Sequence, residues 1–239
     1  MNLLIDIGNS SVKAAFAKGV ELGITHRYFG ENLLGFIKGV MSGNRPDIIA
    51  ISSVRKIDDY LSDTLRMMCG KLIIVGFETE LPIKNGYSTP ETLGSDRLLA
   101  AVGAFELFKG RECLIFDFGT ALTIDRLDAN GVFCGGNISL GLNIRIKALH
   151  EYTQRLPLIE IPKKVVTVGG STKEAIESGI ILGMVYEIEG YINRYPDCIF
   201  VFTGGDAIYF AEKMKRSIFV VYNLVLMGLA HVAHYHAKT

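Results

Sequence analysis

The sequence lacks an excess of charge of either sign. Lysine and arginine together number 25, as do aspartate and glutamate, so the formal net charge at pH 7 is zero. A chain without net positive charge has no overall electrostatic attraction to nucleic acid or to an anionic membrane surface. We therefore expect neither nucleic acid nor membrane as a partner, and ligands must be argued from local sites.

Long hydrophobic runs are also missing. The longest candidate, residues 218–233, is interrupted by Tyr222, Asn223, Gly228 and His231. It falls short of the ~20 continuous apolar residues that a membrane-spanning helix needs, so a buried helix is expected there. The N-terminus begins with a strand pattern and shows no cationic leader or cleavage site, so we expect a cytoplasmic protein.

Cysteine is sparse, and the pattern needed for a metal or redox centre is absent. The four cysteines are widely separated and form no CxxC pair, which favours reduced, mostly buried thiols. The histidines at positions 231, 234 and 236 do not all share one helical face, so a solvated terminal turn is favoured over a metal site.

What the chain does contain is a repeated order of strand and helix patterns. With 49% hydrophobic residues over 239 positions, it can bury a large core. The first half predicts a meander of three strands followed by a helix, a strand, a second helix and a further strand. These segments are residues 2–7, 10–17, 22–29, 31–42, 47–54, 58–68 and 71–76.

The second half predicts the same kind of unit. Three strand patterns are followed by a long helix, a strand, a helix, a short strand and a terminal helix; the ranges assigned are 112–119, 120–127, 131–139, 172–194, 197–205 and 206–215. We expect an α/β fold of two duplicated halves, residues 1–108 and 109–239, with a hinge near 98–112. Alternating helices and strands indicate mixed sheets flanked by helices, and halves without a flexible linker are expected to share a cleft.

Two strands end in the same kind of corner, an aspartate followed by a second residue, a glycine and small hydroxyl residues. DIGNSSVK begins at Asp6, and DFGTALTID begins at Asp117. Glycine lets the backbone turn and leaves room for a phosphate, while amides and hydroxyls donate to its oxygens. The proposed phosphate contacts are Gly8, Asn9, Ser10, Ser11, Lys13, Gly119 and Thr120.

The carboxylates of these corners need a cation between them and any phosphate. Mg²⁺ held mainly through water suits such a site, with Asp6 as a candidate ligand. A third glycine-rich turn, TGGDA, follows a strand and opens a helix, where Gly204 and Gly205 can approach a nucleotide. One such corner is an ordinary turn, but three at strand ends predict a nucleotide in the cleft between the halves.

The segment YSTPETLGSDR, residues 87–97, separates the two corners. It is a polar loop that leads into a helix, and Asp96 and Arg97 lie near the helix start. An acid at this position is stabilised by the helix dipole, which is the purely structural interpretation. The residues alone leave that interpretation and a catalytic one open.

Taken together, the three corners resemble the phosphate and adenosine motifs of the acetate and sugar kinase, Hsp70 and actin superfamily, which has a duplicated ribonuclease H-like fold. With YxxPxxLGxDR and with GGNISLGL, which begins at Gly135, the combination resembles type III pantothenate kinase over nearly the whole chain. The resemblance implies ATP-dependent phosphorylation of pantothenate to 4′-phosphopantothenate, the first step of coenzyme A biosynthesis, by a homodimer.

The same resemblance implies roles for individual residues. Asp96 is the expected catalytic base, Asp117 the site of a monovalent cation, K⁺ or NH₄⁺, and Thr120 an ATP contact. The expected substrate contacts are Tyr87, Gly94, Ser95, Asp96, Arg97 and Thr172. Arg97 has two interpretations, a partner for the pantothenate carboxylate or for an acid of the chain itself.

Two positions depart from the family pattern. Leu140 replaces a usual proline, and Ser10 replaces a common threonine. Neither change removes a proposed ligand, and Leu140 is expected to affect substrate positioning more than activity. The alternative function is that of a non-catalytic relative acting as a transcription accessory protein. Retention of Asp6, Lys13 and Asp96, together with Asp117 and Thr120, argues against it.

Overall fold

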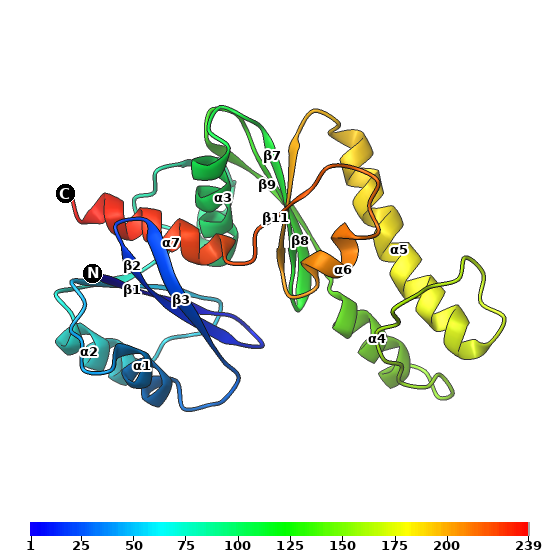
Figure 1. Ribbon diagram of the computed structural model, residues 1–239, viewed down its shortest axis with the longest axis horizontal. Coiled ribbons are helices and arrows are strands. Elements are labelled where there is room, and N and C mark those ends of the chain that lie inside the picture. Colours follow the sequence, from blue (N-terminus) through cyan, green and yellow to red (C-terminus); the bar gives the residue numbers. More distant parts are fainter. Residues whose placement is uncertain (239) are drawn as a thin grey trace. The chain divides into compact units, whose positions relative to one another are not determined.

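The computed structural model describes residues 1–238 and contains two sheets (Figure 1). The first has the order β3-β2-β1-β4-β5. Strands β1 and β2 form an antiparallel hairpin to which β3 is added, whereas β4 and β5 run parallel to β1. The bounds are β1 Asn2–Ile7, β2 Val12–Lys18, β3 Glu21–Tyr28, β4 Ile48–Ser53 and β5 Lys71–Ile74.

Helices cover both faces of this sheet (Figure 1). One face packs on α1 (Leu33–Met41) and α2 (Asp59–Met68), and the core there includes Leu3, Ile5 and Ile7. The other face packs on α7 (Leu224–His236), which in turn packs on α3 (Ser95–Leu107). Because side chains alternate along a strand, Asp6 belongs to the face that α3 and α7 cover.

Helices α3 and α7 cross closely because glycine faces the partner backbone on each of them. A Cβ atom at Gly103 would lie 2.6 Å from the carbonyl oxygen of Leu224, and one at Gly228 would lie 2.0 Å from that of Leu99. Any larger residue would force the helices apart. The terminal helix predicted from residues 218–233 is therefore held against the first sheet, far in sequence from its neighbours.

The second sheet repeats the strand order of the first. Its order is β11-β10-β7-β8-β9-β6, so β9-β8-β7-β10-β11 corresponds to β3-β2-β1-β4-β5. Strand β10 runs parallel to both β7 and β11, as β4 does to β1 and β5. The bounds are β6 Lys84–Asn85, β7 Cys113–Phe118, β8 Ala121–Leu127, β9 Val132–Leu140, β10 Ile199–Gly204 and β11 Phe219–Val220. This order confirms the predicted duplicated ribonuclease H-like fold.

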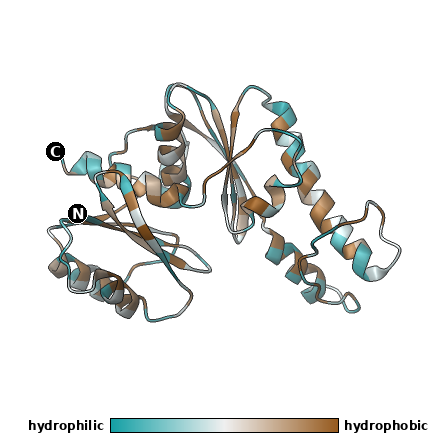
Figure 2. Ribbon diagram, viewed as in Figure 1, coloured by the Kyte–Doolittle hydropathy of each residue, from teal (hydrophilic) through white to brown (hydrophobic). Residues whose placement is uncertain are grey.

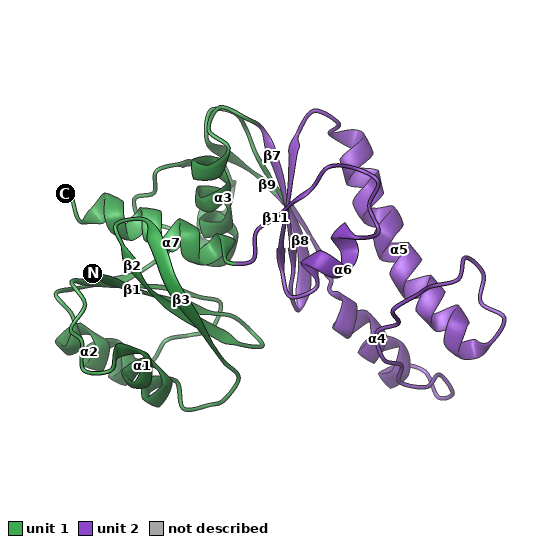
Figure 3. Cartoon of the chain, viewed as in Figure 1, with its two compact units in different colours: residues 1–111, 125–135, 223–239 green, residues 112–124, 136–222 purple. Residues whose placement is uncertain are grey.

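Contacts divide the chain into two compact units (Figure 3). The first comprises Met1–Arg111, Asp125–Gly135 and the segment from Asn223 onward; the second comprises Glu112–Ile124 and Gly136–Tyr222. The boundaries fall inside β8 and β9, and α7 belongs to the first unit. The halves expected at 1–108 and 109–239 are defined by the sequence repeat instead of by contacts, and they remain a prediction.

The second unit packs its helices on a phenylalanine-rich core. Phe116, Phe118, Phe202 and Phe210 are all 2% exposed or less, and their rings contact one another. Helix α5 alternates hydrophobic and hydrophilic residues along its length (Figure 2), and its buried side is part of this core. The bounds are α4 Leu142–Glu151, α5 Thr172–Arg194 and α6 Ala207–Ala211.

Most predicted elements are confirmed, and the differences are local. Helix α6 ends at Ala211, whereas the prediction extended it to residue 215. Strand β6 was not predicted, because two residues are too few to show a period. The segment expected to contain a hinge, 98–112, is helical as far as Leu107. A short 3₁₀ turn, Pro90–Thr92, precedes α3.

Candidate active site

The first corner is a tight turn between β1 and β2. The amide of Gly8 donates to the carbonyl oxygen of Ser11 (3.0 Å), while Asn9 and Ser10 are exposed. Asp6 is opposite Lys13 in the hairpin register and beside Ser52 of β4 in the parallel register. The sequence correctly predicted that glycine, small polar residues and a lysine gather at the end of this strand.

Asp6 is set in a charged environment that favours its neutral form. Burial, the largest influence, and the nearby charge of Asp96 raise its pKa from 3.8 to about 6, although Lys13 and a hydrogen bond with Ser52 act in the opposite direction. Burial and a neighbouring carboxylate both raise the cost of ionising Asp6, which makes this a favourable place for a cation. The first unit thus brings Asp6, Lys13 and Asp96 together.

Two arginines at this corner were missed by the sequence analysis. The Arg55 Nη2 atom donates to the carbonyl oxygen of Asn9 (2.5 Å), and Arg27 Nε donates to Ser11 Oγ (3.2 Å). Arg55 follows β4, which is parallel and adjacent to β1, so its position at the same sheet edge was a usable signal. Arg27 is opposite Lys13 across the β2–β3 pair. The corner therefore carries three cationic side chains.

The segment 87–97 is anchored at both ends. At its start, β6 runs parallel to β9, and the amide of Gly86 donates to the carbonyl oxygen of Phe133 (3.0 Å). At its end, Ser95 Oγ accepts from the amide of Ser53 (3.3 Å) and shares a hydrogen bond with Ser52 Oγ (3.2 Å). The polar loop that contains the 3₁₀ turn is thereby tied to β9 at its start and to β4 at its end.

Asp96 occupies the first turn of α3 and is half-buried. Its Oδ1 atom accepts from the amide of Arg97 (2.9 Å), as an acid at a helix start does. Burial is the largest influence and raises the pKa of Asp96, whereas the hydrogen bond and the charge of Arg97 lower it in part. A Cβ atom at Gly94 would lie 2.5 Å from this Oδ1 atom, so the carboxylate needs glycine there.

Arg97 pairs with an acid of the chain itself, Asp125. Its Nε atom donates to Asp125 Oδ1 (3.0 Å) and Oδ2 (3.1 Å), and Nη2 donates to Oδ1 (2.5 Å). Burial tends to lower the pKa of Arg97, but the hydrogen bonds and charge of Asp125 outweigh it, so the pKa is raised. The guanidinium also lies 5.6 Å from the ring centroid of Tyr87.

The second corner lies in the second unit and is shaped by backbone contacts. Asp117 of β7 is beside Thr203 of β10, which leads into Gly204. Gly204 has a φ of +93°, and a Cβ atom there would lie 2.5 Å from both Asp117 Oδ1 and the carbonyl oxygen of Phe118. Only glycine suits this position, because a side chain would collide with both oxygens. The DFG and TGGDA motifs thus lie next to each other.

The loop before α4 closes on the same corner. The amide of Gly141 donates to the carbonyl oxygen of Thr120 (3.0 Å). Arg145 Nε donates to the carbonyl oxygen of Leu140 (2.8 Å), and Arg145 Nη2 pairs with Glu187 (2.5 Å). The leucine that replaces the usual proline is therefore held by a side chain of α4, which limits the loosening expected at this position.

The remaining predicted positions, Thr172 and Gly205, are exposed. Thr172 is the exposed first residue of α5, whose N-cap Ser171 accepts from the amide of Glu174 (3.3 Å). Gly205 is exposed and follows Gly204 in the turn before α6. Burial raises the pKa of Asp206 in that turn.

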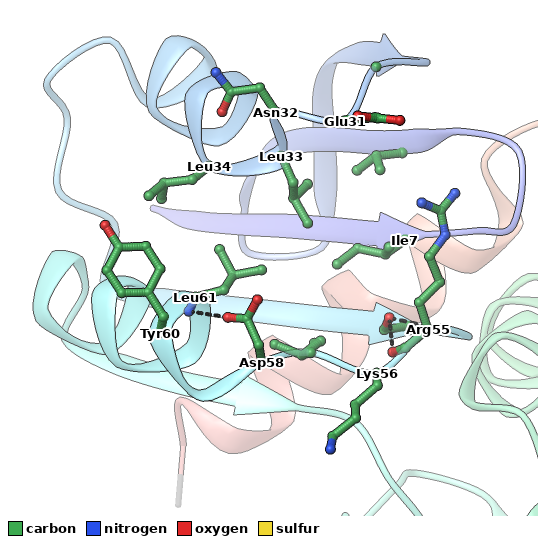
Figure 4. Close-up of a pocket in the computed structure, with 14 residues that line it drawn as sticks. Ile7, Glu31, Asn32, Leu33, Leu34, Arg55, Lys56, Asp58, Tyr60 and Leu61 are labelled. Atoms are coloured by element: carbon green, nitrogen blue, oxygen red, sulfur yellow. Dashed lines mark hydrogen bonds between the residues drawn. The ribbon is translucent and has the colours of Figure 1, made fainter.

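A separate pocket of about 330 Å³ lies beneath the starts of α1 and α2 (Figure 4). Ile7, Leu33 and Leu61 point into it, Arg55 stands at its edge and Lys56 points away (Figure 4). Because Ile7 and Asp6 face opposite sides of β1, the pocket is on the face away from Asp96.

The cysteines fit the prediction of mostly buried thiols. None of the four forms a disulfide, and three of them are buried. Within residues 1–238, no cluster of three or more His, Cys, Asp or Glu side chains is arranged to hold a metal ion. Across the same residues, none of the helices combines the length and the apolar character needed to cross a bilayer.

Comparison with known proteins gives consistent results. The family model of type III pantothenate kinase matches residues 2–194. A type III pantothenate kinase of Phocaeicola vulgatus is 39% identical over 243 residues and covers all of both chains.

Solved structures support the fold at lower identity. A Campylobacter jejuni protein described as a Baf family transcriptional activator is 20% identical with a TM-score of 0.67, covering 99% of this chain and 100% of that one. The activator of 2-hydroxyisocaproyl-CoA dehydratase from Clostridium difficile, solved with bound ADPNP, is 14% identical with a TM-score of 0.57, covering 99% and 95%. The match of the family model and the full-length identity to its members show that the chain belongs to the type III pantothenate kinase family.

Proposed function

We propose that this protein transfers the γ-phosphoryl group of ATP to the primary hydroxyl of pantothenate, the first step of coenzyme A biosynthesis. The observation that carries the proposal is the placement of Asp96. The anchored segment 87–97 holds this carboxylate close enough to Asp6 for its charge to raise the pKa of Asp6, so a candidate base adjoins a phosphate corner. Family membership supplies the substrate, which geometry alone cannot choose.

Asp96 acts as the base late in the reaction. A carboxylate is too weak to ionise an alcohol before attack, but in a loose transition state the hydroxyl loses its proton as the new P–O bond forms. Asp96 orients the hydroxyl and then accepts the proton. Burial supports this role because it raises the pKa of Asp96 toward the working pH, which makes the carboxylate a stronger base.

Each corner by itself offers groups that suit the phosphates of ATP. Lys13 contributes a positive charge, and the amides and hydroxyls of Asn9, Ser10, Ser11 and Thr120 donate hydrogen bonds. Gly8 and Gly119, whose amides close the turns, leave room for phosphate, and Gly204 and Gly205 lie near the nucleoside. Charge on the transferring group is stabilised by such preorganised donors. Arg27 and Arg55 add positive charge at the first corner.

The acids of the two corners suit two kinds of cation. Asp6 has one further carboxylate close by, Asp96, and the described residues contain no cluster of three ligands. Such a site fits Mg²⁺ that is bound mainly through water and phosphate. When bound, Mg²⁺ supplies charge neutralisation for the phosphates. Asp117 Oδ1 and the carbonyl oxygen of Phe118 converge beside Gly204, and such oxygen donors fit a monovalent cation, K⁺ or NH₄⁺.

Pantothenate contacts Tyr87, Gly94, Ser95, Asp96 and Arg97. The family resemblance further implies a homodimer in which Thr172 contacts the substrate, and the exposed position of Thr172 at the start of α5 is compatible with that contact. We also propose a cytoplasmic location, where ATP is supplied. Arg97, already paired with Asp125, contributes a guanidinium whose orientation is fixed before substrate binds.

The decisive experiment measures ADP release with and without pantothenate, in K⁺ and in Na⁺ buffers, with the product identified by mass spectrometry. We expect turnover that requires pantothenate and is faster with K⁺. Asp96→Asn should bind ATP and melt normally yet lose about 10²–10⁴-fold in kcat, the usual contribution of a general base.

A matched control is Asp63→Asn, which removes an acid from an exposed ion pair on α2 and should leave turnover unchanged. Turnover that ignores pantothenate under every cation contradicts the kinase assignment. Turnover by Asp96→Asn at the rate of the control removes Asp96 from its role.

A further inference from the structure

A buried ion pair joins β8 to the first turn of α3. Arg97 is 7% exposed and Asp125 1% exposed, and three hydrogen bonds of 2.5–3.1 Å connect them. A fork of this kind fixes the plane of the guanidinium as well as its position. Since a buried charge is strongly destabilising when unpaired, the orientation of Arg97 depends on Asp125.

The oriented guanidinium also sets the position of Tyr87. It lies 5.6 Å from the ring centroid of Tyr87 and 5.7 Å from that of Phe133. The ring of Tyr87 fits against β9 because Gly135 has no side chain, and a Cβ atom there would lie 3.3 Å from the ring. Tyr87 and Phe133, whose ring centroids are 6.2 Å apart, thus both adjoin the guanidinium beside β9.

The pair also constrains Asp96. The amide of Arg97 donates to Asp96 Oδ1, so a shift of Arg97 changes the hydrogen bond that holds the carboxylate. On the other side of Asp96, Ser95 is tied to Ser52 and Ser53. Asp96 is therefore held between two anchors, one on β4 and one on β8.

Sequence alone placed Asp125 with the second phosphate corner, as the last residue of DFGTALTID. The burial of Asp125 and its pairing with Arg97 indicate a different role, that of orienting the arginine. We propose that Asp125 is a positioning residue for pantothenate phosphorylation, which sets Arg97 and through it Tyr87 and Asp96. This inference rests on the proposed function, and it predicts an effect on pantothenate and the chemical step with little effect on ATP.

The test compares Asp125→Asn with Asp63→Asn, which makes the same change of charge at an exposed ion pair. We expect kcat/KM for pantothenate to fall about 100-fold in Asp125→Asn, the scale of a displacement of about 1 Å in a reacting group. The affinity for ATP, measured by calorimetry without pantothenate, should stay within about twofold. Asp63→Asn should match the wild type in both measurements.

A second variant keeps the inference testable if Asp125→Asn does not fold. Phe133→Leu removes one ring from the guanidinium without changing charge, and we expect kcat/KM for pantothenate to fall about 3–10-fold, again with ATP affinity retained. Wild-type pantothenate kinetics in a folded Asp125→Asn, or in Phe133→Leu if the first variant is unfolded, would overturn the inference. So would an equal loss of ATP affinity. If the wild type itself ignores pantothenate, the proposed function fails instead.

Discussion

The two aspartate–glycine corners have the same place in two sheets of the same strand order, yet they differ in chemistry. The first is rich in charge: Asp6 is close to Asp96 and Lys13, and Arg27 and Arg55 hold the turn. The second is shaped by backbone, with Gly204 and Gly141 in contact with the loop at 118–120. Duplication preserved the strand order, and the contacts of each corner then diverged.

We propose that this difference lets the two corners bind different cations. A charge-rich corner close to two carboxylates suits a divalent ion, whereas one carboxylate beside a carbonyl oxygen suits a monovalent ion. Matched substitutions in the two corners should distinguish their roles.

The largest effect is expected from removing each corner's carboxylate in turn. Asp6→Asn should lower kcat by about 10²–10³-fold, because an acid that supports charge neutralisation is lost, and should raise the Mg²⁺ concentration needed for half-maximal turnover. Asp117→Asn should instead abolish the difference between K⁺ and Na⁺ buffers. Steady-state kinetics with each cation varied separately make the comparison. Identical cation responses in the two variants would contradict the division between corners.

The next effect concerns the glycines. Gly204→Ala places a side chain at a φ of +93° and 2.5 Å from two oxygen atoms, so the free energy of unfolding should fall by about 3 kcal/mol. Gly8→Ala is the matched change in the first corner. Its Cβ atom would lie 3.2 Å from the carbonyl oxygen of Ser11, and its cost should be about 1 kcal/mol or less. Urea denaturation measures both, and equal losses would show that the second corner has no special need for glycine.

The smallest effect is a pH dependence of stability from Asp6. Its pKa is about 6 in the folded protein and 3.8 by itself. Below pH 3.8 the group is neutral in both states, so it costs nothing. As pH rises from 3.8 to 6, the unfolded state ionises first, and the folded protein loses stability by an amount that is complete above pH 6.

Asp6→Asn should therefore stabilise the ligand-free protein by about 1–2 kcal/mol more at pH 7 than at pH 4, because the asparagine cannot ionise. Thermal unfolding at the two pH values checks this. The corresponding change at the exposed Asp63 is the control. A stabilisation that does not change with pH would contradict the raised pKa of Asp6.

Much of the fold was predictable because its signals are local. The bounds of α5 matched the expected 172–194, since a capping serine, a helical period and a final arginine lie together in the sequence. The three corners were predicted from short motifs at strand ends. Because β1 and β4 are parallel neighbours, the residues that follow them lie at the same edge of the sheet. Arg55 follows β4 and reaches the first corner, but the sequence analysis missed it.

The sequence by itself determined the family, the duplicated order of strands and helices, and the residue types at each corner. Only the tertiary structure decided which acid pairs with Arg97, which arginines reach the first corner and where α7 packs. The residues that these contacts join are separated in the sequence by 16 to more than 100 positions. The contacts therefore depend on how sheets and helices pack together. A hydrogen-bond partner is chosen by geometry and burial, and neither is encoded in a local pattern.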